Sequence, residues 1–158
     1  MAEIPAGYFI RRATLADAPD VIRLRVAMQQ EHRSADSFSD EYMDATEASF
    51  HEMLATDYYR GWLAFPVRAE KPIAVAGYII LHHPPKPDRI GQDRAYVISV
   101  YTEPEHRYKG VARALMQNVI EHARAQGFRR LELRSSLEGR HLYSKLGFEP
   151  QEVWMLEL

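Results

Sequence analysis

The sequence contains no cysteine. This absence excludes disulfide bonds, metal sites built on thiolates and a cysteine nucleophile. The chain also lacks a run of about 20 apolar residues, the length that a membrane-spanning helix needs. Its first nine residues, MAEIPAGYF, show no basic region followed by an apolar stretch, so no signal peptide is expected. We therefore expect a cytoplasmic protein that has no membrane partner.

Net charge is small as well. The 158-residue chain has 20 basic and 22 acidic residues, a formal net charge of −2. This balance argues against a nucleic-acid partner, and the sequence has no extended basic stripe with interleaved aromatic residues. Any anion-binding site must therefore be local. The length is typical of one domain, and no repeat or linker divides the chain, so we expect a single domain over residues 1–158.

Hydrophobic periodicity and turn residues predict alternating strands and helices. Strands are expected at 8–13, 61–69, 72–83, 95–102, 129–136 and 152–158, and helices at 18–28, 40–56, 108–126 and 138–146. Thr14 and Asp17 resemble a capping box at the start of the first helix, where Arg25 interrupts the apolar stripe. The inner face of the second helix is expected at Tyr42, Ala45, Ala48 or Ser49, and Met53.

The order of these elements is β-α-α-β-β-β-α-β-α-β, which predicts an α/β (α+β) fold. Antiparallel hairpins come first, and one β-α-β unit follows between residues 95 and 135. Such a crossover is right-handed and makes its two strands parallel, so the sheet should be mixed and mostly antiparallel. It also brings the start of helix 108–126 beside the carboxyl end of strand 95–102. Open α/β sheets bind ligands at such a position.

The segment YTEPEHRYKGVARALMQ, residues 101–117, has an unusual helix start. Arg107, Lys109 and Arg113 crowd a helix end that normally attracts anionic side chains, and Gly110 lies in the expected first turn. Free N–H groups at a helix start bind anions, and a glycine lets a ligand approach the backbone closely. These features predict a local anion site, with a merely solvated basic face as the alternative. The motifs of a P-loop and of a Rossmann phosphate loop are absent from the sequence.

Two motifs make the sequence resemble the GCN5-related N-acetyltransferase (GNAT) superfamily. The first is the family pattern of Gln or Arg, two residues, Gly, one residue, then Gly or Ala, which Arg107, Gly110 and Ala112 match. The second is LYSKLGF, residues 142–148, which follows a short helix. The resemblance covers almost the whole chain, but it is specific over 95–150 and weak before residue 60. It implies a GNAT-like single domain in which the strands at 95–102 and 129–135 splay apart.

The resemblance also implies a site for acetyl-CoA. Its pyrophosphate would lie on the N–H groups of residues 108–113, and its pantetheine arm would pair with the end of strand 95–102. Tyr108 and Ser136 depart from the family pattern, which often has glycine and asparagine at these positions. The implied cofactor-binding residues are Tyr101, Thr102, Arg107, Tyr108, Lys109, Gly110, Val111, Ala112, Arg113 and Ser136.

Acetyl transfer to an amine needs a donor to the thioester oxygen and a proton for the leaving thiolate. By resemblance, the backbone N–H near Thr102 is the donor. Tyr143 is the predicted catalytic acid, because a tyrosine of pKa about 10 is protonated at neutral pH. A core tyrosine at a helix end is the structural alternative for Tyr143.

The amine must also lose a proton. Glu103 is the predicted catalytic base because it follows the strand end, whereas Asp93, His82, His83 and a water relay are alternatives that stay open. No metal is expected. His82 and His83 are adjacent in an expected strand and would point to opposite faces, which disfavours a metal pair.

Acceptor choice should come from the first half of the chain. The region around loop 32–39 and helix 40–56 is acidic, with Glu31, Asp36, Asp40, Glu41, Asp44 and Glu47 against Arg33. It would steer a cationic primary amine of a small molecule or peptide, although a solvated helix face is the alternative explanation. A non-catalytic acyl-CoA-binding regulatory module is the alternative function. A homodimer is compatible with the sequence, which does not fix the oligomeric state.

Overall fold

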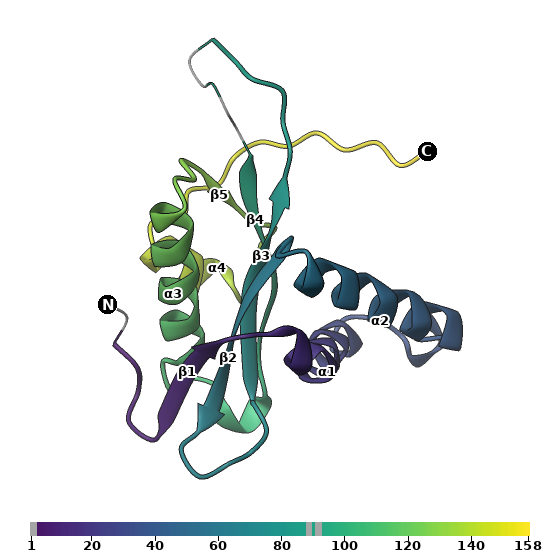
Figure 1. Ribbon diagram of the computed structural model, residues 1–158, viewed down its shortest axis with the longest axis vertical. Coiled ribbons are helices and arrows are strands. Elements are labelled where there is room, and N and C mark those ends of the chain that lie inside the picture. Colours follow the sequence, from purple (N-terminus) through teal and green to yellow (C-terminus); the bar gives the residue numbers. More distant parts are fainter. Residues whose placement is uncertain (1–2, 88–89, 91–92) are drawn as a thin grey trace.

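The computed structural model describes residues 3–87, 90 and 93–158. Its centre is a five-stranded sheet in the order β1-β2-β3-β4-β5 (Figure 1). The strands β1 to β4 pair antiparallel, and β5 runs parallel to β4. The predicted mixed, mostly antiparallel sheet with one parallel β-α-β unit is thus confirmed. The strands are β1 (Tyr8–Arg12), β2 (Tyr59–Pro66), β3 (Ala74–Leu81), β4 (Arg94–Thr102) and β5 (Leu131–Glu132).

Helices cover both faces of the sheet. Figure 1 shows α1 and α2 on one side of it and α3 and α4 on the other. The helices are α1 (Ala18–Gln30), α2 (Asp40–Ala55), α3 (Val111–Ala125) and α4 (Arg140–Lys145). The alternation of β2 explains this arrangement, because successive side chains of a strand point to opposite faces. Trp62 and Ala64 pack with Leu115 of α3, whereas Leu63 and Phe65 pack with Leu24 of α1.

The turn that leads into α1 follows its sequence signal, whereas α2 departs in part from its predicted inner face. The backbone N–H and the hydroxyl of Thr14 each donate to Oδ2 of Asp17 at 2.8 Å, so the predicted capping box is confirmed. In α2 the predicted inner face is wrong in part, because Ala45, Ala48 and Ser49 are exposed. Phe50 is the buried residue of α2, and its ring packs edge-on against Tyr59 at 5.3 Å. This large aromatic contact sets the rotation of the helix, and small alanines do not compete with it.

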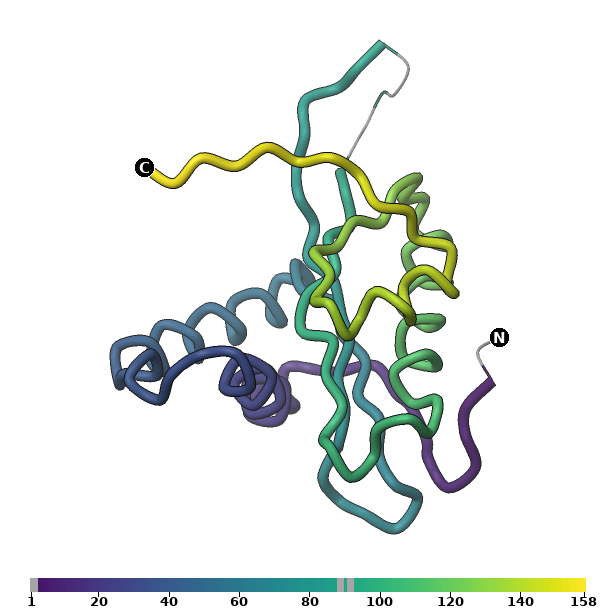
Figure 2. The backbone as a smooth tube through the Cα atoms, turned by 180° about the vertical axis from the view of Figure 1, so that it is seen from behind, coloured from purple at the N-terminus to yellow at the C-terminus, as the bar shows by residue number. Residues whose placement is uncertain are grey.

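Two predicted elements near the C-terminus differ from the structure. The strand expected at 129–136 is reduced to Leu131–Glu132, and residues 151–158 form no strand at all. The reason is pairing, since a strand needs a neighbour for its backbone groups. β5 bonds to β4 at two positions only, and the C-terminal segment leaves the sheet and ends clear of it (Figure 2).

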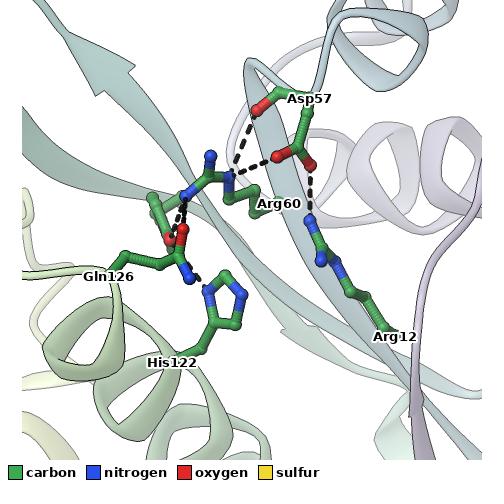
Figure 3. A network of polar contacts seen from close by, with 6 residues as sticks. Arg12, Asp57, Arg60, His122 and Gln126 are labelled. Carbon is green, nitrogen blue, oxygen red and sulfur yellow. Dashed lines mark hydrogen bonds and ion pairs between the residues drawn. The ribbon is translucent and has the colours of Figure 1, made fainter.

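A polar network ties the sheet to the last turn of α3 (Figure 3). Asp57, before β2, accepts hydrogen bonds from Arg12 of β1 and from Nε of Arg60 at 2.9 Å. Arg60 in turn donates to Oε1 of Gln126 at 3.1 Å, at the end of α3. On the same side, the Tyr78 hydroxyl shares a 2.9 Å hydrogen bond with Nδ1 of His122. These contacts fix the rotation of α3 on β2 and β3.

Candidate functional site

A cavity of about 920 Å³ opens where β4 and β5 separate. The two strands pair only at Ala95–Leu131 and Tyr96–Glu132, and β4 then continues to Thr102 paired with β3 but not with β5. The predicted divergence of these strands is therefore present in the structure. The cavity is lined by the end of α1, the second half of β4, the loop before α3, the segment after β5, and α4.

A bulge bends β4 at the cavity. Ser99 has a φ of 58°, in the left-handed region, and the register with β3 shifts between Val75 and Gly77. An extra residue in one strand bends it and increases its twist, which turns the end of β4 away from β5. Arg25 supports this conformation, since its Nη1 donates to Oγ of Ser99 at 2.9 Å. The interruption of the apolar stripe by Arg25 was the one sequence signal of this contact.

The unpaired edge of β4 ends at Thr102. The N–H of Glu103 donates to the carbonyl oxygen of Ile73 at 2.9 Å, on the β3 side. Because backbone groups alternate along a strand, the N–H and carbonyl of Thr102 point the other way, into the gap between β4 and β5. The side-chain Oγ1 of Thr102 is buried and has no hydrogen-bond partner among the described residues. The N–H of Thr102 is thus a free donor at the end of this edge.

The loop before α3 exposes a row of backbone N–H groups. Tyr108 and Gly110 have φ values of 59° and 83°, and α3 begins only at Val111. Within the part of the chain that the structure describes, no hydrogen bond uses the N–H groups of residues 108–113, and Ala114 is the first to donate, to Gly110. Gly110 is therefore the residue before the helix and not part of its first turn, contrary to expectation. Its left-handed conformation explains the glycine without any cost of glycine within a helix.

The three basic side chains at this loop have different roles. Arg107 donates through Nε to the carbonyl oxygen of Thr102 at 2.9 Å and pairs with Glu31 through Nη2. Lys109 donates to the carbonyl of Glu105 at 2.8 Å and does not line the cavity. Arg113 lines the cavity, is exposed and has no ionic or hydrogen-bonded partner among the described residues. Only Arg113 is therefore an uncommitted cation at the free N–H groups.

Tyr143 approaches the same cavity from α4. Its ring packs edge-on against Phe148 at 5.9 Å, and burial raises the pKa of Tyr143 above its ordinary value of 10.0. The hydroxyl therefore keeps its proton at neutral pH. Ser136 lies beside it and accepts a hydrogen bond from the N–H of Gly139 at 3.2 Å. Ser136 thus closes the turn that leads into α4.

Ten of the twelve predicted site residues line this one cavity, and two do not. The two exceptions are Lys109, which bonds to the carbonyl of Glu105, and Glu103, which lies on the β3 side of the end of β4. The Glu103 carboxylate accepts a 2.7 Å hydrogen bond from Arg23 of α1, which also donates to the carbonyl oxygen of Pro72 at 2.6 Å. The other side chains considered as the base, Asp93, His82 and His83, are also absent from the cavity lining. Asp93 and Nδ1 of His82 share a 2.8 Å hydrogen bond, and His83 is exposed.

Glu31, expected as part of an acidic acceptor wall, instead lies in the cavity beside the cofactor-site residues, a position that sequence reasoning did not predict. It accepts hydrogen bonds from Arg107 and, at 3.2 Å, from the Tyr101 hydroxyl. It lies 76 positions from Arg107 in sequence, and no local pattern indicates that pairing. The remaining acidic residues of the predicted acceptor wall, from Asp36 to Glu47, do not line the cavity. Instead the lining contains Glu31 and Glu138 against five arginines: Arg25, Arg33, Arg107, Arg113 and Arg134.

The sequence matches the model of the Acetyltransferase (GNAT) family over residues 25–148. This chain belongs to that family. The match spans both motifs that carried the resemblance, Arg107 to Ala112 and Leu142 to Phe148, so the identification from the sequence is confirmed. As a GNAT member the chain is an acetyltransferase by family. No curated protein matches the sequence.

Solved structures agree with this assignment. A GCN5-related N-acetyltransferase from Ralstonia eutropha JMP134 is 27% identical, with a TM-score of 0.86 over 96% of this chain and 99% of that one. A predicted acetyltransferase with acetyl-CoA from Clostridium acetobutylicum is 24% identical, with a TM-score of 0.82 over 96% and 95%. An aminoglycoside N-acetyltransferase in complex with CoA is 21% identical, with a TM-score of 0.74 over 99% and 98%. The last two show the shared fold.

Over the described ranges, no helix combines the length and apolar character needed to cross a membrane. The same ranges contain no group of three or more His, Cys, Asp or Glu side chains that could hold a metal ion.

Proposed function

We propose that this GNAT member is an acetyl-CoA-dependent N-acetyltransferase, a single domain over residues 1–158 that transfers an acetyl group to a primary amine by direct attack on the thioester. One observation carries the proposal. The free N–H groups of residues 108–113, the unpaired edge of β4 and the protonated hydroxyl of Tyr143 all belong to one continuous cavity. An anion site, a strand-like pairing edge and an acid are the three features that this reaction needs.

The residues of the cavity fit acetyl-CoA. A pyrophosphate would be held by the N–H groups of residues 108–113 at the positive end of α3, with Arg113 as its free cation. Gly110 presents no Cβ to that anion. The pantetheine amides would pair with the exposed edge of β4 at Tyr101 and Thr102, as an added strand does. Ser136 would meet the cofactor with a hydroxyl where many family members have an amide, and Tyr108 would cover the phosphate loop.

The chain's own groups account for the chemistry once acetyl-CoA supplies the activated acetyl group. The N–H of Thr102 points into the gap and would donate to the oxygen on which negative charge develops. Tyr143 holds its proton in a half-buried place and would release it to the departing sulfur. Burial favours the neutral phenol until that moment, because charge is costly in a poorly hydrated site.

The amine proton requires another route, because Glu103 is held by Arg23 outside the cavity. We propose that water carries this proton to solvent, and the cavity opens far enough for that path. The charge of the lining also alters the expected acceptor. Arg113 is assigned to the pyrophosphate and Arg107 is paired with Glu31, which leaves Arg25, Arg33 and Arg134 against Glu138 in the lining. This remaining positive charge disfavours a polycation, so the acceptor is a neutral or anionic amine rather than the cationic one suggested by the acidic helix.

Thiol release tests this proposal directly. The chain has no cysteine, so a thiol reagent detects CoA without background from the protein. Acetyl-CoA is incubated with a panel of neutral, anionic and cationic primary amines, and the Tyr143→Phe variant is compared with Tyr58→Phe, whose tyrosine lies outside the cavity. We expect amine-dependent thiol release that Tyr143→Phe reduces by about 100-fold or more. Binding of CoA with no release from any amine would instead indicate the non-catalytic module.

A further inference from the structure

Arg25 is a partly buried cation without an anionic partner in the described chain. The structure describes five partly buried arginines: Arg23, Arg25, Arg60, Arg94 and Arg107. Four of them form an ion pair with a carboxylate. Arg25 is the exception, since both of its contacts with described residues, with Ser99 and Phe50, are to neutral groups. Removing a charge from water is costly unless an opposite charge compensates it, so Arg25 indicates an anion that binds from outside the chain.

Arg23, two residues earlier on α1, provides the contrast. Its guanidinium donates to Glu103 at 2.7 Å, to Asp20 at 3.3 Å and to the carbonyl oxygen of Pro72 at 2.6 Å. These contacts use its donors and neutralise its charge. Arg25 donates a single hydrogen bond within the described chain, from Nη1. Its Nε and Nη2 groups are therefore free to donate to a ligand.

Neutral contacts hold the Arg25 side chain at the cavity. Its guanidinium lies 5.5 Å from the ring centre of Phe50, the buried residue of α2. Its 2.9 Å hydrogen bond to Oγ of Ser99 ties it to the bulge of β4, and both Arg25 and Ser99 line the cavity. These contacts fix the position of the cation without cancelling its charge. A ligand that binds a side chain held in this way pays little entropy for ordering it.

Arg25 reaches the cavity from the side opposite the proposed pyrophosphate site. Figure 1 shows α1 on one face of the sheet and α3, whose start carries the free N–H groups, on the other. Along β4, Ser99 precedes Thr102 by three positions, a span of at most about 10 Å. The N–H of Thr102 is the group assigned to the thioester oxygen, so one small molecule can contact Arg25 and still bring an amine to the thioester.

A carboxylate is the anion that suits this arrangement. The planar guanidinium offers paired N–H groups that match the two oxygens of a carboxylate, and the single charges balance. The Ser99 hydroxyl accepts from Arg25 and keeps its own proton to donate. Met28, Tyr96 and Ile98 also line the cavity and suit the carbon skeleton of a small molecule.

We propose that Arg25 binds a carboxylate of the acetyl acceptor, which is therefore an amino acid or another small amine with a free carboxylate. This inference rests on the acetyl transfer proposed above and narrows its acceptor to one chemical class. Arg25 determines specificity by holding one end of the molecule, and it takes no part in proton transfer. Arg33 and Arg134 line the same cavity without an ionic partner among the described residues, and their charge steers an anion toward it.

Paired acceptors isolate the contribution of the carboxylate. Amino acids with the amine in the α, β or ω position are each compared with their own carboxamide by thiol release at saturating acetyl-CoA. We expect the kcat/KM of the best acid to exceed that of its carboxamide by about tenfold or more. Arg25→Gln should abolish this ratio by raising KM for the acid, and Arg25→Lys, which keeps the charge but not the planar fork, should retain part of it. Arg140→Gln removes an exposed arginine outside the lining and should leave the ratio unchanged.

The same ratio separates recognition of the carboxylate from damage to the structure. A disturbed bulge at Ser99 would slow the reactions of acid and carboxamide together and preserve the ratio. A ratio near one in the native protein, or an unchanged ratio in Arg25→Gln, would overturn the carboxylate site while acetyl transfer to amines still stood. Faster reaction of an aminoalkyl phosphate than of the acid of equal length would also contradict it.

Isothermal titration of the same acids into CoA-saturated protein tests the site without turnover. We expect saturable binding whose Kd rises by about tenfold or more in Arg25→Gln and is unchanged in Arg140→Gln. Acids that bind in this way without any thiol release would support the carboxylate site and contradict acetyl transfer. Failure of every acid to bind would overturn the carboxylate site.

Discussion

Gly139 lies directly against the ring of Tyr143. A Cβ atom on Gly139 would lie 2.7 Å from Cε2 of that ring and 3.3 Å from Oγ of Ser136. Contacts under about 3 Å are repulsive, so any side chain at residue 139 must displace the ring. The backbone of Gly139 is ordinary, with φ and ψ of −75° and −20°, which means that space and not conformation requires the glycine. Gly139 thus sets the position of the proposed acid.

Gly139→Ala should therefore lower kcat, by about tenfold or more, while the Kd for CoA changes little. The substitution moves the phenol away from the sulfur without touching the phosphate loop. Ser144→Ala, on the exposed side of the same helix, is the matched control. Steady-state kinetics and calorimetry on both variants provide the comparison. A kcat equal to that of the native protein would show that the position of Tyr143 is unimportant to the reaction.

Arg113→Gln should have opposite effects on stability and on binding. Without ligand, removal of a cation from the start of α3 relieves a repulsion with the helix dipole and should raise stability by a few tenths of a kcal/mol up to about 1 kcal/mol. With CoA present, the same change removes the free cation and should weaken binding severalfold, an effect that grows at low salt. Arg124→Gln, in the last turn of the same helix, should leave the affinity unchanged. Equal CoA affinity for native protein and Arg113→Gln would contradict the assignment of this side chain.

The hydrogen bonds that Asp17 accepts predict that part of the free energy of unfolding is lost in acid. Hydrogen bonds from Arg11, aided by those from Thr14, lower the pKa of Asp17 from 3.8 to about 2. Its stabilisation is complete above the unfolded value of 3.8 and is lost as the pH falls through about 2. Asp17→Asn should therefore cost about 1 kcal/mol at pH 7 and progressively less below pH 3.8. Urea unfolding at several pH values measures this, and a cost that is independent of pH would refute it.

The lowered pKa of His122 predicts a second pH dependence of folding stability, at higher pH than that of Asp17. Burial, helped by the charges of Arg12 and Arg60, lowers the pKa of His122 below 6.5, so the folded protein holds it neutral (Figure 3). Between that lowered value and 6.5 the unfolded chain binds a proton that the folded chain does not, and stability falls as the pH drops. His122→Gln should flatten this part of the curve. An unaltered slope between pH 7 and 5 in the variant would assign the effect to other groups.

The sequence was informative where local patterns determine structure. The strand predicted at 61–69 and the capping box of Thr14 and Asp17 depend on local patterns, and both are present, the strand as β2 (Tyr59–Pro66). The family motifs led to the residues around Gly110 and Tyr143, which meet in one cavity although they lie far apart in the chain. The conformation of Gly110 was misjudged, because a helical pattern does not distinguish a first-turn residue from a left-handed residue that precedes the helix.

The remaining differences come from contacts between distant residues. Glu31 reaches Arg107, and Arg25 reaches Ser99, from α1 across to β4 and the phosphate loop. Glu103 follows the strand end as predicted, but the alternation of the strand turns its carboxylate to Arg23 on the opposite side. The tail 152–158 has a strand sequence but forms no strand, and no backbone hydrogen bond joins it to another described strand. Such outcomes depend on three-dimensional register, which residue patterns do not encode.

The central claim is that the free N–H groups of residues 108–113 hold the pyrophosphate of CoA. Isothermal titration of CoA into Gly110→Glu tests it most directly, with Gly127→Glu as the control. Both glycines have left-handed φ values, 83° and 82°, so the backbone strain of substitution is matched. A Cβ atom at Gly110 would lie 3.3 Å from Cγ of Pro5, whereas Gly127 has open space around its Cβ position. We predict that Gly110→Glu weakens CoA binding by at least about 100-fold, or 2.7 kcal/mol, and that Gly127→Glu keeps the native Kd. An unchanged Kd for Gly110→Glu would contradict the account.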